Sequence, residues 1–323
     1  MKNAMDSTGV HGLRPRRLLF WGLIGFGAFI AAAASLIILL GLLSLVLPKG
    51  DCVGVIKVDG TILAGKTPEG LFAGDEVGSD DVTALVEEAG KRNEVKAVVV
   101  EINSGGGSVV GSREIYESLK GLKKPKVAYL REVAASGGYY VAAGTDYIVS
   151  DPDALTGSIG VRATAVDLSG LFEKIGYNQT VIKSGEMKDM GDVYRPLTPE
   201  EKAVMQAIVD EIFDEFKGVV VESRGNKLDM DGFNEVLDGR ILTGRQAQRI
   251  GLVDETGNRK LALRKAAALA NMTYEGDAPP VCEISKERGL LEKALSLSGR
   301  FASDALKELL SFGTAARGIT VRY

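Results

Sequence analysis

The order of apolar and polar residues predicts a chain in two parts. Residues 18–47 carry no charged side chain, whereas from residue 51 onward short apolar runs alternate with amphipathic segments. A helix needs about 20 apolar residues to cross a bilayer, and residues 18–47 exceed that length. We therefore expect a transmembrane helix that is followed by a folded domain.

The charges beside this apolar segment predict its orientation. The basic residues on its N-terminal side are Lys2, Arg14, Arg16 and Arg17. Because basic residues collect on the cytoplasmic side of a membrane helix, we expect residues 1–17 in the cytoplasm and the folded domain outside it, on the cell membrane. A cleaved signal peptide is the alternative, but its apolar core is normally shorter and no small-x-small cleavage site follows this one.

The pattern beyond residue 50 is typical of an α/β domain. Runs rich in β-branched residues predict strands at Val53–Val58, Val95–Ile102, Val127–Leu130, Tyr147–Val149 and, more weakly, Thr180–Ile182. Apolar residues at helical spacing predict helices that begin near Ser79, Val109, Thr198, Thr243 and Leu261. Strands that alternate with helices pair in parallel through right-handed crossovers. The domain is therefore expected to hold a parallel sheet with crossover helices.

A serine followed by glycines stands where a strand gives way to a helix. Ser136 precedes Gly137 and Gly138, and the run Tyr139–Ala143 continues with helix-compatible residues. A helix that starts here directs unpaired amides at its N-terminal end, which favours negative charge there. Such a place suits a nucleophilic serine and the oxyanion that it generates. The alternative is a helix of small residues that packs closely against the sheet.

A second glycine-rich stretch, Gly105–Gly107, also follows a predicted strand. The carboxyl ends of parallel strands gather ligands and catalytic groups, so both glycine stretches are expected at one edge of the sheet. A phosphate loop is disfavoured, because neither the Gly-Lys-Ser/Thr ending nor the dinucleotide spacing is present. A loop that donates amides to a carbonyl oxygen and a plain tight turn remain as interpretations.

The amino-acid composition limits the kinds of active site and partner that the domain can have. The 323 residues include one histidine, His11, which precedes the apolar segment. A Ser-His-Asp triad, a Cys-His pair and a histidine zinc site are therefore excluded from the domain. The net charge of −4 gives no reason to expect nucleic acid as a partner. Cys52 and Cys282 have no metal-like spacing, and whether they pair stays open.

Without histidine, a serine nucleophile needs another base. A lysine serves if burial and its neighbours favour the neutral amine. The candidates after the serine are Lys174, Lys183, Lys188 and Lys202. Their spacing alone does not choose among them.

Six ordered blocks together carry a family resemblance. They are VVVEINSGGGSV, AASGGYYVA, LTGSIGV, IKSGEMKD, YRPLTPEE and GRILTGRQAQRIGLVDE. From about Gly54 to Asn271 the chain resembles the signal peptide peptidase A family in its short, single-domain form. The resemblance implies a ClpP/crotonase-like α/β fold and a serine–lysine protease domain at residues 48–271, followed by a C-terminal helical segment and tail at 272–323.

The resemblance also implies roles for particular residues. By position, Ser136 matches the nucleophile and Lys188 the general base, while Ser158 matches the serine that orients the lysine. The amides of Gly137 and Gly107 match the oxyanion hole. The chain departs from the family at Gly105, where proline is common, which makes the assignment of Gly107 weaker than that of Ser136.

The resemblance further implies a membrane-anchored serine endopeptidase that needs no cofactor and no metal. Its substrates would be remnant signal peptides and other membrane-associated or misfolded polypeptides. Similar short proteins form a ring of eight subunits, in which serine and lysine come from neighbouring subunits. The alternatives are a protease relative that acts with a membrane scaffold partner, an acyl-CoA enzyme of the same fold, and a non-catalytic scaffold.

Overall fold

The computed structural model describes residues 50–68 and 75–284. The expected cytoplasmic segment, the expected membrane helix at 18–47 and most of the segment 272–323 lie outside this part of the chain. Among the residues that are described, no helix has the length and apolar character needed to cross a membrane. Apart from Gly50, the described residues belong to one unit, which begins at Asp51.

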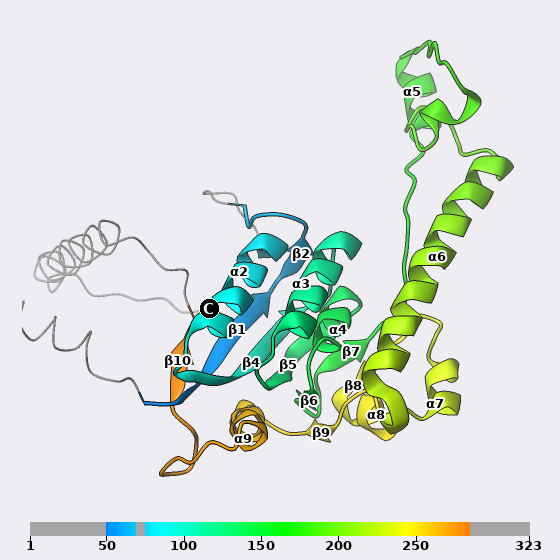
Figure 1. Cartoon of the computed structure of the whole chain (residues 1–323). Helices are drawn as coiled ribbons and strands as arrows, with labels where there is room; N and C mark the ends of the chain where they lie inside the picture. The colour runs from blue at the N-terminus through cyan, green and yellow to red at the C-terminus, as the bar shows by residue number, and fades with distance from the viewer. Residues whose placement is uncertain (1–49, 69–74, 285–323) are drawn as a thin grey trace, which may run out of the picture. The chain divides into compact units, whose positions relative to one another are not determined.

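A mostly parallel sheet forms the centre of this unit (Figure 1). Its strands in spatial order are β10 (Val281–Glu283), β1 (Cys52–Asp59), β4 (Val95–Ser104), β5 (Lys126–Ala135), β6 (Tyr147–Ser150) and β9 (Glu255–Thr256). β7 (Leu155–Gly157) continues beside the end of β5 in parallel, and β8 (Ile241–Thr243) pairs with β7 in the antiparallel sense. A separate pair consists of β2 (Thr61–Leu63) and β3 (Glu76–Gly78). The predicted α/β class with a parallel sheet is confirmed, and β8 is the exception to parallel pairing in the described part.

Helices cover both faces of the sheet. α2 (Ser79–Lys91), α3 (Val109–Gly121) and α4 (Gly137–Ala142) lie on one face and α9 (Arg259–Leu269) on the other. The remaining described helices are α5 (Ser169–Ile175), α6 (Pro199–Arg224), α7 (Met230–Glu235) and α8 (Gly244–Arg249), with the short 3-10 helices η1 (Glu186–Asp189) and η2 (Gly225–Lys227). Val98 and Val100 of β4 belong to the core under α2, α3 and α4, whereas Val99 belongs to the core under α9. A strand that is buried on both faces reads as a continuous apolar run, as it does here.

Local sequence signals account for several helix ends. The Thr198 hydroxyl accepts a hydrogen bond from the Glu201 amide at 3.2 Å, and the Glu201 carboxylate accepts one from the Thr198 amide at 3.0 Å. This capping box confirms the predicted start of α6. α2 begins at Ser79, as predicted, although its N-cap is Gly78 and no side chain caps it. The Ser79 hydroxyl instead accepts a bond from the Gly65 amide.

The last described strand closes one edge of the sheet. β10 pairs in parallel with β1, and a disulfide joins Cys52 to Cys282 with their Cα atoms 5.7 Å apart. The two cysteines, whose pairing the sequence left open, therefore meet. The sheet also continues past residue 271, where the protease domain was expected to end.

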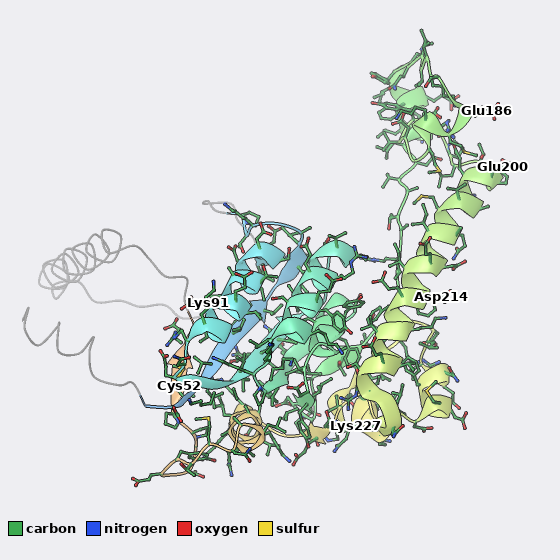
Figure 2. All side chains as sticks on the ribbon, viewed as in Figure 1. Cys52, Lys91, Glu186, Glu200, Asp214 and Lys227 are labelled. Carbon is green, nitrogen blue, oxygen red and sulfur yellow. A yellow bond between two sulfur atoms is a disulfide. The ribbon has the colours of Figure 1, made fainter. Side chains whose placement is uncertain are left out.

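Residues 161–198, called the arm here, run away from the sheet and return through α6 (Figures 1 and 2). None of the arm residues is fully buried. The weak prediction of a strand at Thr180–Ile182 is wrong: the segment has no strand assignment, none of the described strands pairs with it, and Ile182 is 96% exposed. β-branched residues favour extended backbone, but a strand needs a partner to hydrogen-bond with.

Candidate active site

Ser136 occupies the sharp junction between β5 and α4. Its backbone has φ 52° and ψ −121°, a conformation that side-chain-bearing residues adopt rarely and at a cost of about 1–3 kcal/mol. Its amide donates to the Gly157 carbonyl at 2.8 Å and its carbonyl accepts from the Tyr140 amide at 3.0 Å, so the strained residue is held on both sides. The hydroxyl does not cap α4, which leaves it available for chemistry.

The loop after β4 lies directly against the start of α4. A Cβ atom built on Gly106 would be 2.5 Å from the Gly137 nitrogen, and one built on Gly137 would be 3.3 Å from the Gly107 nitrogen. Gly106 has φ +95° and Gly107 has φ +154°, so glycine is required here for both space and conformation. β4 and β5 are neighbours in the sheet, and this places their carboxyl ends, each with a glycine stretch, side by side as predicted.

Two amides of this junction are left unpaired. In the loop, the Gly106 amide donates to Ser104 and the Ser108 amide donates to Ile62. Within the part of the chain that the structure describes, the amides of Gly107 and Gly137 donate to no acceptor. Two neighbouring amides without acceptors can stabilise a developing oxyanion.

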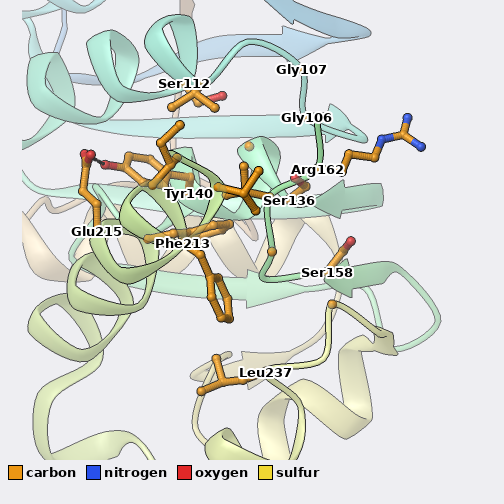
Figure 3. A pocket seen from close by; sticks show the side chains of 18 of the residues that line it. Gly106, Gly107, Ser112, Ser136, Tyr140, Ser158, Arg162, Phe213, Glu215 and Leu237 are labelled. Carbon is orange, nitrogen blue, oxygen red and sulfur yellow. Dashed lines mark hydrogen bonds between the residues drawn. The ribbon is translucent and has the colours of Figure 1, made fainter. Parts of the chain in front are cut away.

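A cavity of about 850 Å³ opens beside Ser136 (Figure 3). Gly107, Gly137 and Ser158 line it together with Ser136. The opposite wall comes mainly from α6 and its surroundings, and it combines apolar side chains with the polar Gln206, Asp210 and Glu215. Its larger apolar side chains are Tyr140, Val209, Ile212, Phe213, Phe216 and Leu237. A cavity of this size and lining accommodates apolar side chains of a peptide.

A polar contact anchors the α6 wall of the cavity. The Tyr140 hydroxyl donates to the Glu215 carboxylate at 3.0 Å, and Arg113 lies 3.7 Å from the same carboxylate. Burial, followed by the bond to Glu215, raises the pKa of Tyr140, so the phenol stays protonated and keeps its donor role. No local pattern indicates this contact, because its two residues are 75 positions apart in the sequence.

Ser158 shares the unusual geometry of Ser136. It follows β7 with φ 49°, and its amide donates to the Arg240 carbonyl at 2.9 Å. β7 pairs with the end of β5, which brings Ser158 to the same cavity as Ser136. Four of the five predicted site residues are thus brought together.

Lys188 is the residue that one chain does not bring to the cavity. It is exposed in η1, which lies near the N-terminal end of α6 (Figure 2, where Glu186 and Glu200 are labelled). Lys188 is not among the residues that line the cavity, and the part of α6 that lines it begins at Gln206, beyond the first turn of the helix. The turn that contains Glu186 and Lys188 lies away from the sheet (Figure 2), so the structure does not bring this lysine to Ser136 of its own chain.

The candidate lysines differ in their surroundings. The Lys183 amine donates to the Glu186 carbonyl at 2.8 Å and to Asp189 at 2.7 Å, so it is already engaged. Within the described ranges, 50–68 and 75–284, the Lys188 amine has no hydrogen-bond or ion-pair partner. Lys188 is therefore free to act on another molecule.

Several known proteins that are similar to this chain are named as proteases. Residues 118–273 match peptidase family S49, a class of serine-type peptidases. The chain is 37% identical over 207 residues to a "Putative protease" of Methanocaldococcus jannaschii, a match that covers 64% of this chain and 66% of that protein. It is 31% identical over 278 residues to "Serine protease SPPA, chloroplastic" of Arabidopsis thaliana, covering 84% of this chain and 40% of that protein.

These matches support membership of the signal peptide peptidase A family. The chain spans less than two thirds of the length of the curated relatives named above. Among solved structures, a membrane-bound stomatin-specific protease is similar with a TM-score of 0.40 and 14% identity, covering 74% of this chain and 99% of that one.

Proposed function

We propose that this protein is a membrane-anchored serine endopeptidase in which Ser136 is the nucleophile and Lys188 of a neighbouring copy is the general base. One observation carries the proposal. The strained Ser136, whose hydroxyl caps no helix, opens onto a cavity beside the unpaired amides of Gly107 and Gly137. The absence of any histidine in the described part leaves lysine as the base that the family resemblance suggests.

The reaction follows from these groups. The neutral Lys188 amine removes the proton from Ser136, whose oxygen attacks the peptide carbonyl. The amides of Gly137 and Gly107 bind the oxyanion, and each such donor is worth about 2.7–4 kcal/mol of transition-state stabilisation. Lys188 then passes its proton to the leaving amine, and a water molecule that it activates hydrolyses the acyl-enzyme. Ser158 holds the lysine amine in line for both transfers.

The proposed dyad of Ser136 and Lys188 requires that several copies of the chain assemble. Since Lys188 does not line the cavity of its own chain, we propose that the amine comes from another subunit, in the ring of eight subunits that the family resemblance implies. Exposed apolar residues on the arm and on the first half of α6 support such contacts. They are Val166, Leu171, Ile175, Tyr177, Ile182, Val204 and Ile208.

The proposed substrates are remnant signal peptides and other membrane-associated or misfolded polypeptides. The apolar side chains in the α6 wall of the cavity support this choice. We place the domain outside the cytoplasm, anchored through residues 18–47, in a ClpP/crotonase-like fold. The Cys52–Cys282 disulfide supports this location, because disulfides persist mainly in oxidising compartments.

Peptide hydrolysis by the assembled protein tests the proposal. Ser136→Ala and Lys188→Ala should each abolish cleavage of an apolar reporter peptide. Lys202→Ala is the matched control, because Lys202 is also exposed and also lacks a partner among the described residues. If both Ser136→Ala and Lys188→Ala cleave as the wild type does, the dyad is wrong and a non-catalytic scaffold becomes the better interpretation.

Mixed assemblies test where the lysine comes from. When subunits with Ser136→Ala are unfolded and reassembled with subunits carrying Lys188→Ala, some sites receive an intact serine from one copy and an intact lysine from the other. Activity should therefore return in the mixture. A mixture that assembles but stays inactive would show that the two residues do not act between copies.

A further inference from the structure

A cluster of charged residues lies in the arm, outside the cavity and next to Lys188. Its centre is Arg195, whose guanidinium contacts two carboxylates. Nε and Nη2 donate to Asp189 at 3.2 and 2.7 Å, while Nη1 and Nη2 donate to Glu201 at 2.8 and 2.5 Å. Each carboxylate is held by a pair of hydrogen bonds, a geometry that an arginine fork supplies and a lysine does not.

Both carboxylates are withdrawn from solvent although the arm itself is exposed. The side chain of Asp189 is 9% exposed and that of Glu201 is 2% exposed. Arg195 and then Lys183 hold the pKa of Asp189 well below its ordinary value, and Arg195 followed by the Thr198 amide lowers the pKa of Glu201 to about 2. The cluster therefore stays charged throughout the neutral pH range.

Besides Arg195, the side chain that holds the turn carrying Lys188 is Lys183, whose amine donates to the Glu186 carbonyl and to the Asp189 carboxylate. η1 is four residues long and contains no buried residue. A 3-10 turn of this length is not stable alone, because it closes few hydrogen bonds for the dihedral angles that it orders. Asp189 directly follows Lys188, so the backbone position of the lysine depends on where the Asp189 carboxylate is held.

The other end of the cluster is attached to a rigid element. Glu201 lies in the first turn of α6 and is also part of its capping box. The same helix contributes Phe213 and Phe216 to the cavity wall. Arg195 therefore connects the turn that carries the proposed base to the helix that forms the substrate cavity.

We propose that Arg195 is a positioning residue for peptide hydrolysis. Its guanidinium locks the turn Glu186–Asp189 onto α6, so that each copy presents Lys188 at a fixed place to the Ser136 of its neighbour. Arg195 touches neither the cavity nor Ser136 and acts through Lys188. The inference rests on the proposed Ser–Lys mechanism and adds to it the residue that makes the exposed turn rigid.

Steady-state kinetics of the full assembled protein test this role. Arg195→Met should lower kcat by about 100-fold, since a misplacement of a catalytic group by about 1 Å costs that much. KM should not change, because Arg195 does not line the cavity. Arg195→Lys keeps the charge but loses the fork, so kcat should fall nearly as far. Arg245→Met is the control, because Arg245 forms an exposed pair with Asp153 away from the arm.

Chemical rescue separates positioning from folding. Ethylguanidinium added to Arg195→Ala should restore part of kcat, whereas Lys188→Ala should not respond. Loss of the assembled particle in size-exclusion chromatography, without recovery by ethylguanidinium, would assign Arg195 to folding and overturn the inference. Wild-type kcat in Arg195→Met, with Lys188→Ala inactive, would overturn it and leave the dyad standing. Activity in Lys188→Ala would instead refute the proposed function itself.

Discussion

The contact between the Gly105–Gly107 loop and α4 can be perturbed by a single methyl group. In Gly106→Ala the new Cβ would lie 2.5 Å from the Gly137 nitrogen and 3.1 Å from the Ala135 carbonyl oxygen. These are backbone atoms, which cannot rotate out of the way as a flexible side chain can. The loop must therefore move away from α4, and this separates the amides of Gly107 and Gly137.

The size of the effect follows from the structure. At φ +95° an alanine is strained, which should cost about 1–3 kcal/mol of folding stability. If the shift removes one oxyanion donor, kcat should fall by about 100- to 1,000-fold. The new Cβ would also lie 3.1 Å from the Ser136 Cβ, so the loss reports on the position of the serine together with that of the two amides.

Gly105→Ala provides the matched control at the neighbouring position. Gly105 has no atom within 4 Å of its Cβ position and no left-handed backbone, so alanine should fit without loss. Both variants are compared by peptide hydrolysis at saturating substrate and by thermal unfolding. Wild-type kcat in Gly106→Ala would refute the assignment of these amides to the oxyanion, and a large loss in Gly105→Ala would refute the steric argument.

Three further changes test other parts of the structure. Cys282→Ser should lower the free energy of unfolding by about 2–5 kcal/mol, measured by urea denaturation without reductant, because the disulfide closes a loop with a sequence separation of 230; an unchanged midpoint would contradict this. Phe216→Ala should cost about 3–5 kcal/mol, since the ring is 4% exposed, and should raise KM for apolar peptides; unchanged stability and KM would place the ring outside the working cavity. Burial alone would raise the pKa of Asp254, but Arg224 and Lys227 outweigh it and lower that pKa. The contribution of Asp254 to the free energy of unfolding is therefore present above the pKa of about 3.9 in the unfolded chain and is lost as the pH falls through the lower pKa of the folded state. Asp254→Asn should remove this part of the dependence of the free energy of unfolding on pH.

The sequence predicts the parts of the site that depend on local rules. Ser136 and both glycine stretches are found because each follows a strand, and the ends of neighbouring parallel strands meet at one edge of a sheet. The start of α6 is found because Thr198 and Glu201 satisfy each other within one turn. Such signals span only a few residues, so the sequence displays them directly.

The parts that the sequence does not predict depend on distant partners. The spacing of residues along the sequence does not show that Lys188 lies outside the cavity of its own chain, because the direction of the arm depends on how α6 packs on the core. Thr180–Ile182 was wrongly predicted as a strand, since composition does not reveal whether a neighbouring strand exists. Arg195 is six residues from each of Asp189 and Glu201. Residues six positions apart are not neighbours in a regular helix or strand, so the spacing gives no sign that these side chains meet.

The pairing of β10 with β1 imposes an order on the assembly of the domain. The ribosome releases β1 first, and the strand that covers its outer edge emerges only near the end of the described domain. Until then this edge exposes unpaired backbone groups, to which a foreign strand can add. The disulfide between Cys52 and Cys282 forms only after β10 has been made, and it holds β10 against β1. Newly made chains can therefore aggregate or bind chaperones through the edge of β1, which β10 covers in the folded protein.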